Sequence, residues 1–398
     1  MVHVLSKDGE LPPPARSQDF DSRGCLAVVA VPVLLLVAVT VAVSVLLSSS
    51  EGSPALAKPA RGKADAPASA VDDRSDEAAP DDVPETGAEG TRAERYPFSD
   101  QSVWRQSVRD APLNDNSDRL VEHLAESVYS RYAGVAAFNV NQYNVAYFVV
   151  GGDTLRTDVA FDDCQDKGST PSGLFDGDAH FADVPIPEGA VPAEGRDGAL
   201  VVYAPDSDQL WEFWRASETQ DGWQACWGGR IDNVSENPGY FDGPFGTTAT
   251  GLSHAGGMIS LADVRAGRID HAVALLAAEP ATFKTFSWPA QRSDGYSDDP
   301  DAVPEGLRLR LASDVDVQSL DLHPIAKMVA LAAQEYGFVV VDKAGATGVY
   351  TESGAAPDGG VDPWEDILDG TPSYLIMDDF PWDELEALPT DYGKPDGE

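Results

Sequence analysis

The stretch Ala199–Ile231 decides the fold: it reads ALVVYAP, the turn PDSDQ, LWEFWRA, the turn SETQDG, and WQACWGGRI. Three runs of aromatic and branched apolar residues separated by turn residues predict a meander of three strands. Similar turn signals recur every 8–12 residues or so from Tyr96 onward. The sequence therefore predicts a mainly β domain, built as an antiparallel β-sandwich.

A few short helices are expected to decorate this sheet structure. Leu120, Leu124, Val128 and Tyr132 share one helical face after capping residues at Asn116 and Ser117. Ser260, Asp263 and Gly267 frame the short helix LADVRA. The third helix begins at Pro324 and ends at Gly337, directly before the strand FVVVD (338–342). These helices do not alternate with strands regularly enough for a parallel βαβ fold.

An uncharged apolar run precedes the domain. Leu26–Leu47 spans 22 residues, enough for a helix to cross a bilayer. We expect a signal anchor over 25–48, because the run is longer than the usual core of a cleavable signal peptide. Arg23 adjoins the run, whereas the first base beyond it is Lys58. This asymmetry favours a cytoplasmic head (1–24) and a single-pass protein of the cell membrane with its large C-terminal domain outside.

Residues 49–95 are rich in Ala, Pro, Ser, Gly, Asp and Glu, which predicts a disordered acidic linker. It leads to an extracytoplasmic β-rich domain (96–390) and a short tail (391–398). The 398-residue chain carries a net charge of −40. The first 95 residues hold nine bases and fifteen acids, which leaves −34 on the domain. Such a field repels phosphates and excludes sequence-independent nucleic-acid binding. Charge alone leaves open whether the acidity reflects a salty habitat or a docking surface.

The strand LWEFWRA carries the first catalytic candidate. Strand periodicity places Leu210, Glu212 and Trp214 on one face. A carboxyl among aromatic side chains suits a general acid or a hydrogen-bonding group for a sugar. The alternative is a Glu212 that lies at a solvated edge or pairs with an arginine. A one-residue change of register decides whether Glu212 faces Trp223 and Trp227 or Gln224 and Cys226.

The eight tryptophans suggest an aromatic platform for a sugar, although most buried tryptophans only fill a core. Together with basic residues that bind hydroxyl groups, they define a candidate ligand-binding set. Its members are Trp214, Trp227, Arg230, Trp288 and Arg292.

His271 in RIDHAVALLA is the second catalytic candidate, and Asp270 beside it is the third. The alternative for His271 is a hydrogen-bonded histidine at the rim of the core. A glycosidase also needs a second carboxylate about 5–10 Å from Glu212. Asp232, Asp263 and Asp270 are the candidates for it.

Metal and cofactor signals are weak. No second histidine stands at metal-ligand spacing, so no zinc site and no other cofactor is predicted. The acidic runs 162–163 and 297–301 offer oxygen ligands for calcium but lack the spacing of an EF-hand, which favours solvated loops. Cys164 and Cys226 are the two cysteines beyond the predicted anchor, and an oxidising compartment would join them in a disulfide.

An ordered series of motifs resembles an uncharacterised bacterial family of exported or membrane-tethered β-rich proteins. The motifs are WEFWRA, GWQACWGGR, GRIDHAVAL, WPAQRSDG and YGFVVVD, within a similarity that covers most of 97–388. The resemblance implies one compact extracytoplasmic unit with a jelly-roll-like sandwich. It implies no catalytic residues.

Two functions are consistent with these features. In the first, the domain binds a polysaccharide of the envelope or environment in an aromatic cleft around Glu212. One version of this hypothesis adds a processing step. In the alternative, it is a non-catalytic adhesion or assembly module that binds an envelope protein. The alternative predicts a large exposed apolar patch and no enclosed polar cleft.

Overall fold

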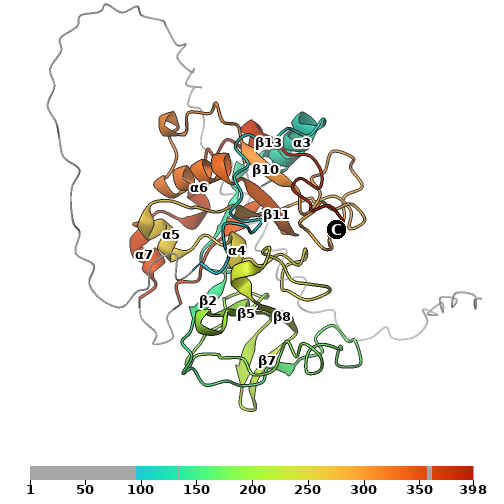
Figure 1. Ribbon diagram of the computed structural model, residues 1–398. Coiled ribbons are helices and arrows are strands. Elements are labelled where there is room, and N and C mark those ends of the chain that lie inside the picture. Colours follow the sequence, from blue (N-terminus) through green and yellow to red (C-terminus); the bar gives the residue numbers. More distant parts are fainter. Residues whose placement is uncertain (1–95, 132–133, 356–360, 398) are drawn as a thin grey trace, which may run out of the picture. The chain divides into compact units, whose positions relative to one another are not determined.

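The computed structural model describes residues 96–131, 134–355 and 361–397. The predicted head, anchor and linker (1–95) lie outside these ranges. Within the described ranges, no helix is both long enough and apolar enough to cross a bilayer. The described domain begins at Tyr96 (Figure 1).

The predicted meander forms most of a four-stranded sheet, drawn in green in Figure 1. Strands β4, β5 and β8 are antiparallel neighbours, and β2 adds to β4 in parallel. The sheet order is β2-β4-β5-β8. The bounds are β2 (Ala146–Val149), β4 (Leu200–Ala204), β5 (Gln209–Trp214) and β8 (Trp227–Asp232).

The third predicted strand divides at Cys226 between two sheets. The residues before it form β7 (Gly222–Ala225), which pairs with β6 (Ser217–Thr219) and β3 (Ala160–Phe161) in a three-stranded sheet. Cys226 donates its amide to the Trp214 carbonyl at 3.1 Å. It also forms a disulfide with Cys164, which follows β3. The disulfide therefore joins the two sheets where the chain passes from one to the other.

The largest sheet has six strands in the order β1-β12-β9-β11-β10-β13. Helix α6 covers strands of this sheet, and α3 lies near β13 (Figure 1). Strand β11 contains the predicted FVVVD, extended by one residue. The bounds are β1 (Ala137–Asn139), β9 (Val273–Ala277), β10 (Arg308–Leu311), β11 (Phe338–Lys343), β12 (Gly348–Tyr350) and β13 (Leu385–Ala387).

The domain is thus β-rich with mixed sheets and few helices. The expectation of antiparallel strands throughout is wrong, because the pairs β1–β12, β2–β4, β3–β7 and β9–β11 are parallel. Parallel neighbours need a long crossover connection. Here the crossovers are long irregular segments as well as helices, so no regular βαβ alternation marks them in the sequence.

The three predicted helices are present. Helix α5 begins with a capping box between Ser260 and Asp263 and ends at Gly267, whose φ is +67°. Predicted helical position Tyr132 lies outside the described residues. The α-helices are α3 (Ser117–Ser130), α4 (His254–Gly257), α5 (Leu261–Ala266), α6 (Pro324–Glu335) and α7 (Pro363–Leu368). The 3₁₀ helices are η2 (Pro205–Ser207), η3 (Val234–Glu236), η4 (Val317–Ser319), η5 (Ser373–Leu375) and η6 (Trp382–Glu384).

The apolar core follows the alternation of side chains along the strands. On β4, Val201 and Tyr203 pack with residues of the six-stranded sheet, including Val339 and Val341. The alternate β4 residues Leu200 and Val202 instead pack with residues of the three-stranded sheet. The four-stranded sheet is therefore buried on both faces, which explains why all five residues of β4 are buried. We call the cluster between the four- and six-stranded sheets the shared core.

Trp104 fixes the start of the domain in this shared core. Its side chain is fully buried, and its Nε1 donates to the Gly239 carbonyl at 2.9 Å. A Cβ placed on Gly239, Gly256 or Gly257 would lie 2.1–2.6 Å from the indole. These glycines are required because the ring packs directly against their backbone.

Candidate functional site

A cleft of about 970 Å³, which we call the central cleft, adjoins the shared core. Its lining comes from β5 and β8 of one sheet and from β1, β9, β11 and β12 of the other. Further lining residues come from 143–144, 165–167, 197–199, 244–249, 292–294 and 344–346 and from His254 of α4 (His254–Gly257). The cleft has the size and mixed polarity typical of small-molecule sites.

Two of the predicted tryptophans line this cleft. Trp214 and Trp227 are paired across β5 and β8, so they share a sheet face. Asp197 accepts the Trp214 Nε1 proton at 3.0 Å. Trp227 stacks on Phe245 at a centroid distance of 5.7 Å, and Lys167 Nζ lies 3.8 Å from its ring centroid. Arg215 lies 5.7 Å from the Trp214 ring centroid, so both tryptophans have protein contacts. Because the Trp227 ring is covered more closely, by Phe245 and Lys167, Trp214 is the better placed of the two to contact a ligand.

Glu212 lies behind the lining of the cleft and is fully buried. Its partner in the sheet is Gly229, so Glu212 shares the face of Trp214 and Trp227. The expected pairing with Trp223 is wrong, because Trp223 lies on β7 and pairs with Glu218 in the three-stranded sheet. Its carboxylate accepts hydrogen bonds from Ser253 Oγ at 2.6 Å, Thr247 Oγ1 at 2.8 Å and the Ala255 amide at 3.3 Å. A network of this kind holds a loop in place.

The glycine opposite Glu212 allows this loop to approach. A Cβ on Gly229 would lie 2.9–3.0 Å from Phe241, Phe245 and the Gly246 amide. Only a residue without a Cβ permits so close a passage of the chain over the strand. The passage brings Thr247 within reach of Glu212.

His254, at the start of α4, lines the cleft and was not identified from the sequence. Its Nδ1 lies 2.7 Å from Thr247 Oγ1. Because the Thr247 hydroxyl donates its proton to Glu212, we assign the Nδ1 proton to His254, which leaves Nε2 as an acceptor. Burial lowers the pKa of His254, so the neutral ring is favoured. The chain Glu212–Thr247–His254 thus orients an imidazole at the cleft wall.

Tyr350 places a hydroxyl at the same wall. It is 2% exposed, and no hydrogen-bond partner for its Oη is found among the described residues. Burial and the nearby Glu212 charge raise the pKa of Tyr350 well above its usual value. A buried hydroxyl without a partner carries a desolvation cost, and because its oxygen is closed to solvent, a ligand in the cleft would bond it only after neighbouring side chains move.

Charged side chains also line the cleft. Arg292, a predicted residue, donates to the carbonyls of Gly243 at 3.3 Å and Thr248 at 3.1 Å. Lys343 Nζ binds the Asp294 carboxylate at 2.5 Å. The lining holds three acids and three bases, so it is balanced within a strongly negative domain. The acids are Asp197, Asp294 and Asp342, and the bases are Lys167, Arg292 and Lys343.

Two other predicted ligand-binding residues lie elsewhere. Arg230 forms an ion pair with Asp232 at 2.9 Å, and Asp232 also accepts from Gln209. Trp288 is 6% exposed and belongs to the shared core. None of these side chains lines the central cleft. The structure therefore brings together Trp214, Trp227 and Arg292 of the predicted set, with Glu212 behind them.

His271 and its neighbours form a separate buried network. His271 is fully buried, its Nε2 lies 3.2 Å from Asp263 Oδ2, and its Nδ1 lies 2.9 Å from the Ala272 carbonyl. Asp263 also caps α5, and Asp270 pairs with Arg268 at 2.9 Å. These contacts match the alternative of a hydrogen-bonded core histidine, and neither His271 nor Asp270 lines the cleft.

The acidic runs considered for calcium cap turns. Asp163 accepts the amides of Lys167 and Gly168, each at 2.7 Å. Asp299 accepts the Asp301 amide at 2.9 Å. Such side-chain-to-backbone bonds are the ordinary use of aspartate in loops.

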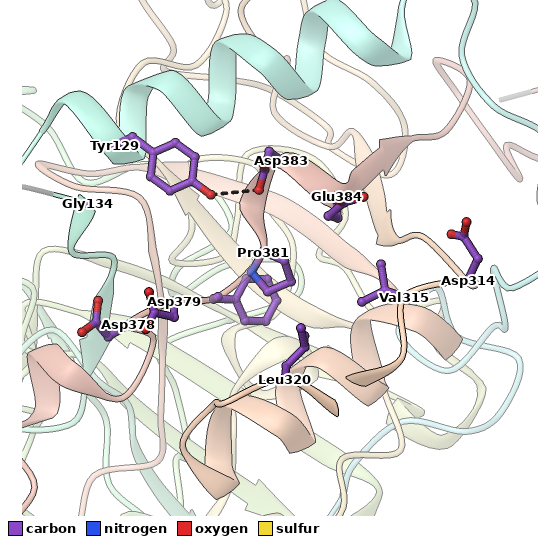
Figure 2. Close-up of a pocket in the computed structure, with 11 residues that line it drawn as sticks. Tyr129, Gly134, Asp314, Val315, Leu320, Asp378, Asp379, Pro381, Asp383 and Glu384 are labelled. Carbon is purple, nitrogen blue, oxygen red and sulfur yellow. Dashed lines mark hydrogen bonds between the residues drawn. The ribbon is translucent and has the colours of Figure 1, made fainter. Parts of the chain in front are cut away.

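A second cavity, of about 590 Å³, lies beside α3 (Figure 2). In it the Tyr129 hydroxyl donates to Asp383 at 2.9 Å, and burial together with this bond raises the pKa of Tyr129 to about 12. Its lining contains five acids and no base, in contrast to the balanced central cleft. The acids are Asp314, Asp378, Asp379, Asp383 and Glu384.

Comparisons of the chain with family models, with curated proteins and with solved structures gave no match. The resemblance to a family of tethered β-rich proteins therefore stays a prediction, and the central cleft has to be interpreted from its own chemistry.

Proposed function

We propose that this domain binds a saccharide in the central cleft. The observation that carries the proposal is that the Trp214 ring and polar groups able to form further hydrogen bonds lie in one cleft. His254 offers its Nε2 lone pair at the cleft wall, and the buried Tyr350 hydroxyl has no hydrogen-bond partner among the described residues. Sugars present both apolar ring faces and many hydroxyl groups, so they match a wall of this composition.

The charge balance of the cleft supports a neutral ligand. The lining as a whole holds three acids and three bases, so its summed charge favours neither an anionic nor a cationic saccharide. The polar groups instead act as paired donors and acceptors for hydroxyl groups.

Binding is supported better than hydrolysis. Asp294 and Asp342 are the adjacent carboxylates of the cleft, and they bring oxygens within 4.8 Å of each other. This oxygen separation is close to the distance of about 5–5.5 Å between the two carboxyl groups of retaining glycosidases. However, Asp294 is bound to Lys343, and the candidate general acid Glu212 lies behind the lining. We therefore place binding first and a processing step second.

The proposal extends to the position of the domain in the cell. The apolar segment 25–48 would anchor the chain in the membrane, with 49–95 as a tether and the β-rich domain outside, where envelope polysaccharides are found. The jelly-roll-like arrangement is part of this proposal and is supported by the core that two sheets share. Protease treatment of intact cells should release the domain, and a domain that stays protected would refute the orientation.

A glycan array probed with the full chain in mild detergent tests the proposal. We expect one class of saccharide to bind, and Trp214→Ala to weaken that binding at least tenfold, about 1.4 kcal/mol. Tyr374, which is 57% exposed and outside the cleft, gives the matched control Tyr374→Ala. Absence of any bound glycan, together with recovery of one envelope protein in pull-downs, would favour the adhesion module instead.

A further inference from the structure

Three carboxylates meet beside the charged side chains of the cleft lining. Asp294, Glu305 and Asp342 each bring one oxygen to within 4.8 Å of the others. Asp342 belongs to β11, whereas Asp294 and Glu305 come from the connection between β9 and β10. The Ser287 amide donates to the Glu305 carbonyl at 2.8 Å, and the Gly306 amide donates to Val340 at 2.7 Å. These backbone bonds fix the cluster against the six-stranded sheet.

Glu305 is the member whose hydrogen-bonding capacity is not met. It is fully buried, and its Oε2 accepts the Asp294 amide at 3.1 Å. Its Oε1 has no hydrogen-bond partner among the described residues. A buried carboxylate with an open oxygen is costly unless a cation or a proton neutralises it.

The nearby bases do not neutralise the Glu305 carboxylate. Lys343 is bonded to Asp294, and Arg292 donates to backbone carbonyls. Within the described residues, neither Glu305 nor Asp342 forms an ion pair, and the Asp342 carboxylate accepts the Ala249 amide at 3.1 Å.

The cluster is also accessible. Asp294 and Asp342 line the central cleft, whereas Glu305 lies behind them. An ion entering from the cleft would meet the two outer carboxylates first and Glu305 at the bottom. An all-oxygen ligand set of this kind selects hard cations such as Ca²⁺ over zinc or copper.

We propose that Asp294, Glu305 and Asp342 bind one divalent cation, Ca²⁺, with water completing its coordination on the cleft side. This inference goes beyond the saccharide proposal and does not depend on it.

Calorimetric titration of the EDTA-treated full chain with CaCl₂, in 150 mM NaCl and 1 mM MgCl₂, tests the site. We expect one saturable Ca²⁺ per chain, with affinity at least tenfold lower in Glu305→Gln and in Asp342→Asn. The matched control is Asp379→Asn in the acidic second cavity, which should change the affinity less than twofold. The salt suppresses diffuse binding to the acidic surface.

A second measurement separates loss of the site from loss of the fold. Ca²⁺ should raise the thermal midpoint of the wild-type chain and leave that of Glu305→Gln unchanged. Without Ca²⁺, Glu305→Gln should be at least as stable as the wild type, because a neutral amide replaces a buried carboxylate with an open oxygen. If Glu305→Gln fails to fold, Asp342→Asn at its half-buried position decides the matter. No saturable binding, or equal binding by the wild type and both variants, would overturn the proposal.

Discussion

Replacement of Glu212 distinguishes a side chain that supports the cleft from one that acts on a ligand. Its carboxylate accepts three hydrogen bonds, from Ser253, Thr247 and the Ala255 amide, at 2.6–3.3 Å. Hydrogen bonds to a charged group contribute about 1.5–3 kcal/mol each. Because the two hydroxyls can turn to other acceptors, we expect the lower end of the sum. Glu212→Ala should lower the free energy of unfolding by about 4.5 kcal/mol, and Glu212→Gln by about 1–2 kcal/mol.

Urea unfolding of the full chain, followed by tryptophan fluorescence, measures these changes. Glu218 is the matched control, because it is an exposed glutamate on β6, and its replacement by Gln should change stability by less than about 0.5 kcal/mol. Glycan binding by Glu212→Gln should weaken only modestly, since Glu212 lies behind the cleft lining. A Glu212→Gln chain of wild-type stability that binds no saccharide would refute the supporting role and return Glu212 to the contact surface.

Three further changes test other parts of the domain. Burial lowers the pKa of His254, although the charges of Glu212 and Asp197 oppose this shift. The stability that the neutral His254 contributes is therefore present above pH 6.5 or so and is lost as the pH falls. Between pH 7.5 and 5.5 the urea midpoint should fall less steeply in His254→Gln than in the wild type. The disulfide joins Cys164 to Cys226, 62 positions later in the sequence. Cys226→Ser should therefore lower the free energy of unfolding by up to about 4 kcal/mol, and a reducing agent should shift the wild-type unfolding curve by the same amount. Arg310 donates to Glu386 and to the carbonyls of residues 108, 109 and 111. Arg310→Lys should lower the free energy of unfolding by about 2–3 kcal/mol and speed proteolysis near residue 110. An unchanged rate of proteolysis would contradict this role.

Local patterns predicted the elements that depend on near neighbours. Alternating residues from Ala199 to Trp214 fixed the meander and placed Glu212 on the face of Trp214. The Ser260–Asp263 capping box and the Pro324 start are likewise contained within one helical turn.

Contacts between distant parts of the chain were beyond the reach of such patterns. The parallel pair β1–β12 joins residues about 210 positions apart, so nothing in either segment indicates its partner. Similarly, the groups that donate hydrogen bonds to Glu212 lie 35 to 43 positions later in the sequence. Asp342 and His254 come from separate elements, and only the packing of two sheets brings both into one cleft.

The seating of Trp104 sets a limit on how this chain can be shortened. Its indole fills a slot between glycine backbones, and its carbonyl accepts the Ala272 amide at 2.6 Å beside β9. A fragment that begins at residue 105 would leave a tryptophan-sized hollow next to α4, the helix that carries His254. A shortened chain should therefore begin before Trp104.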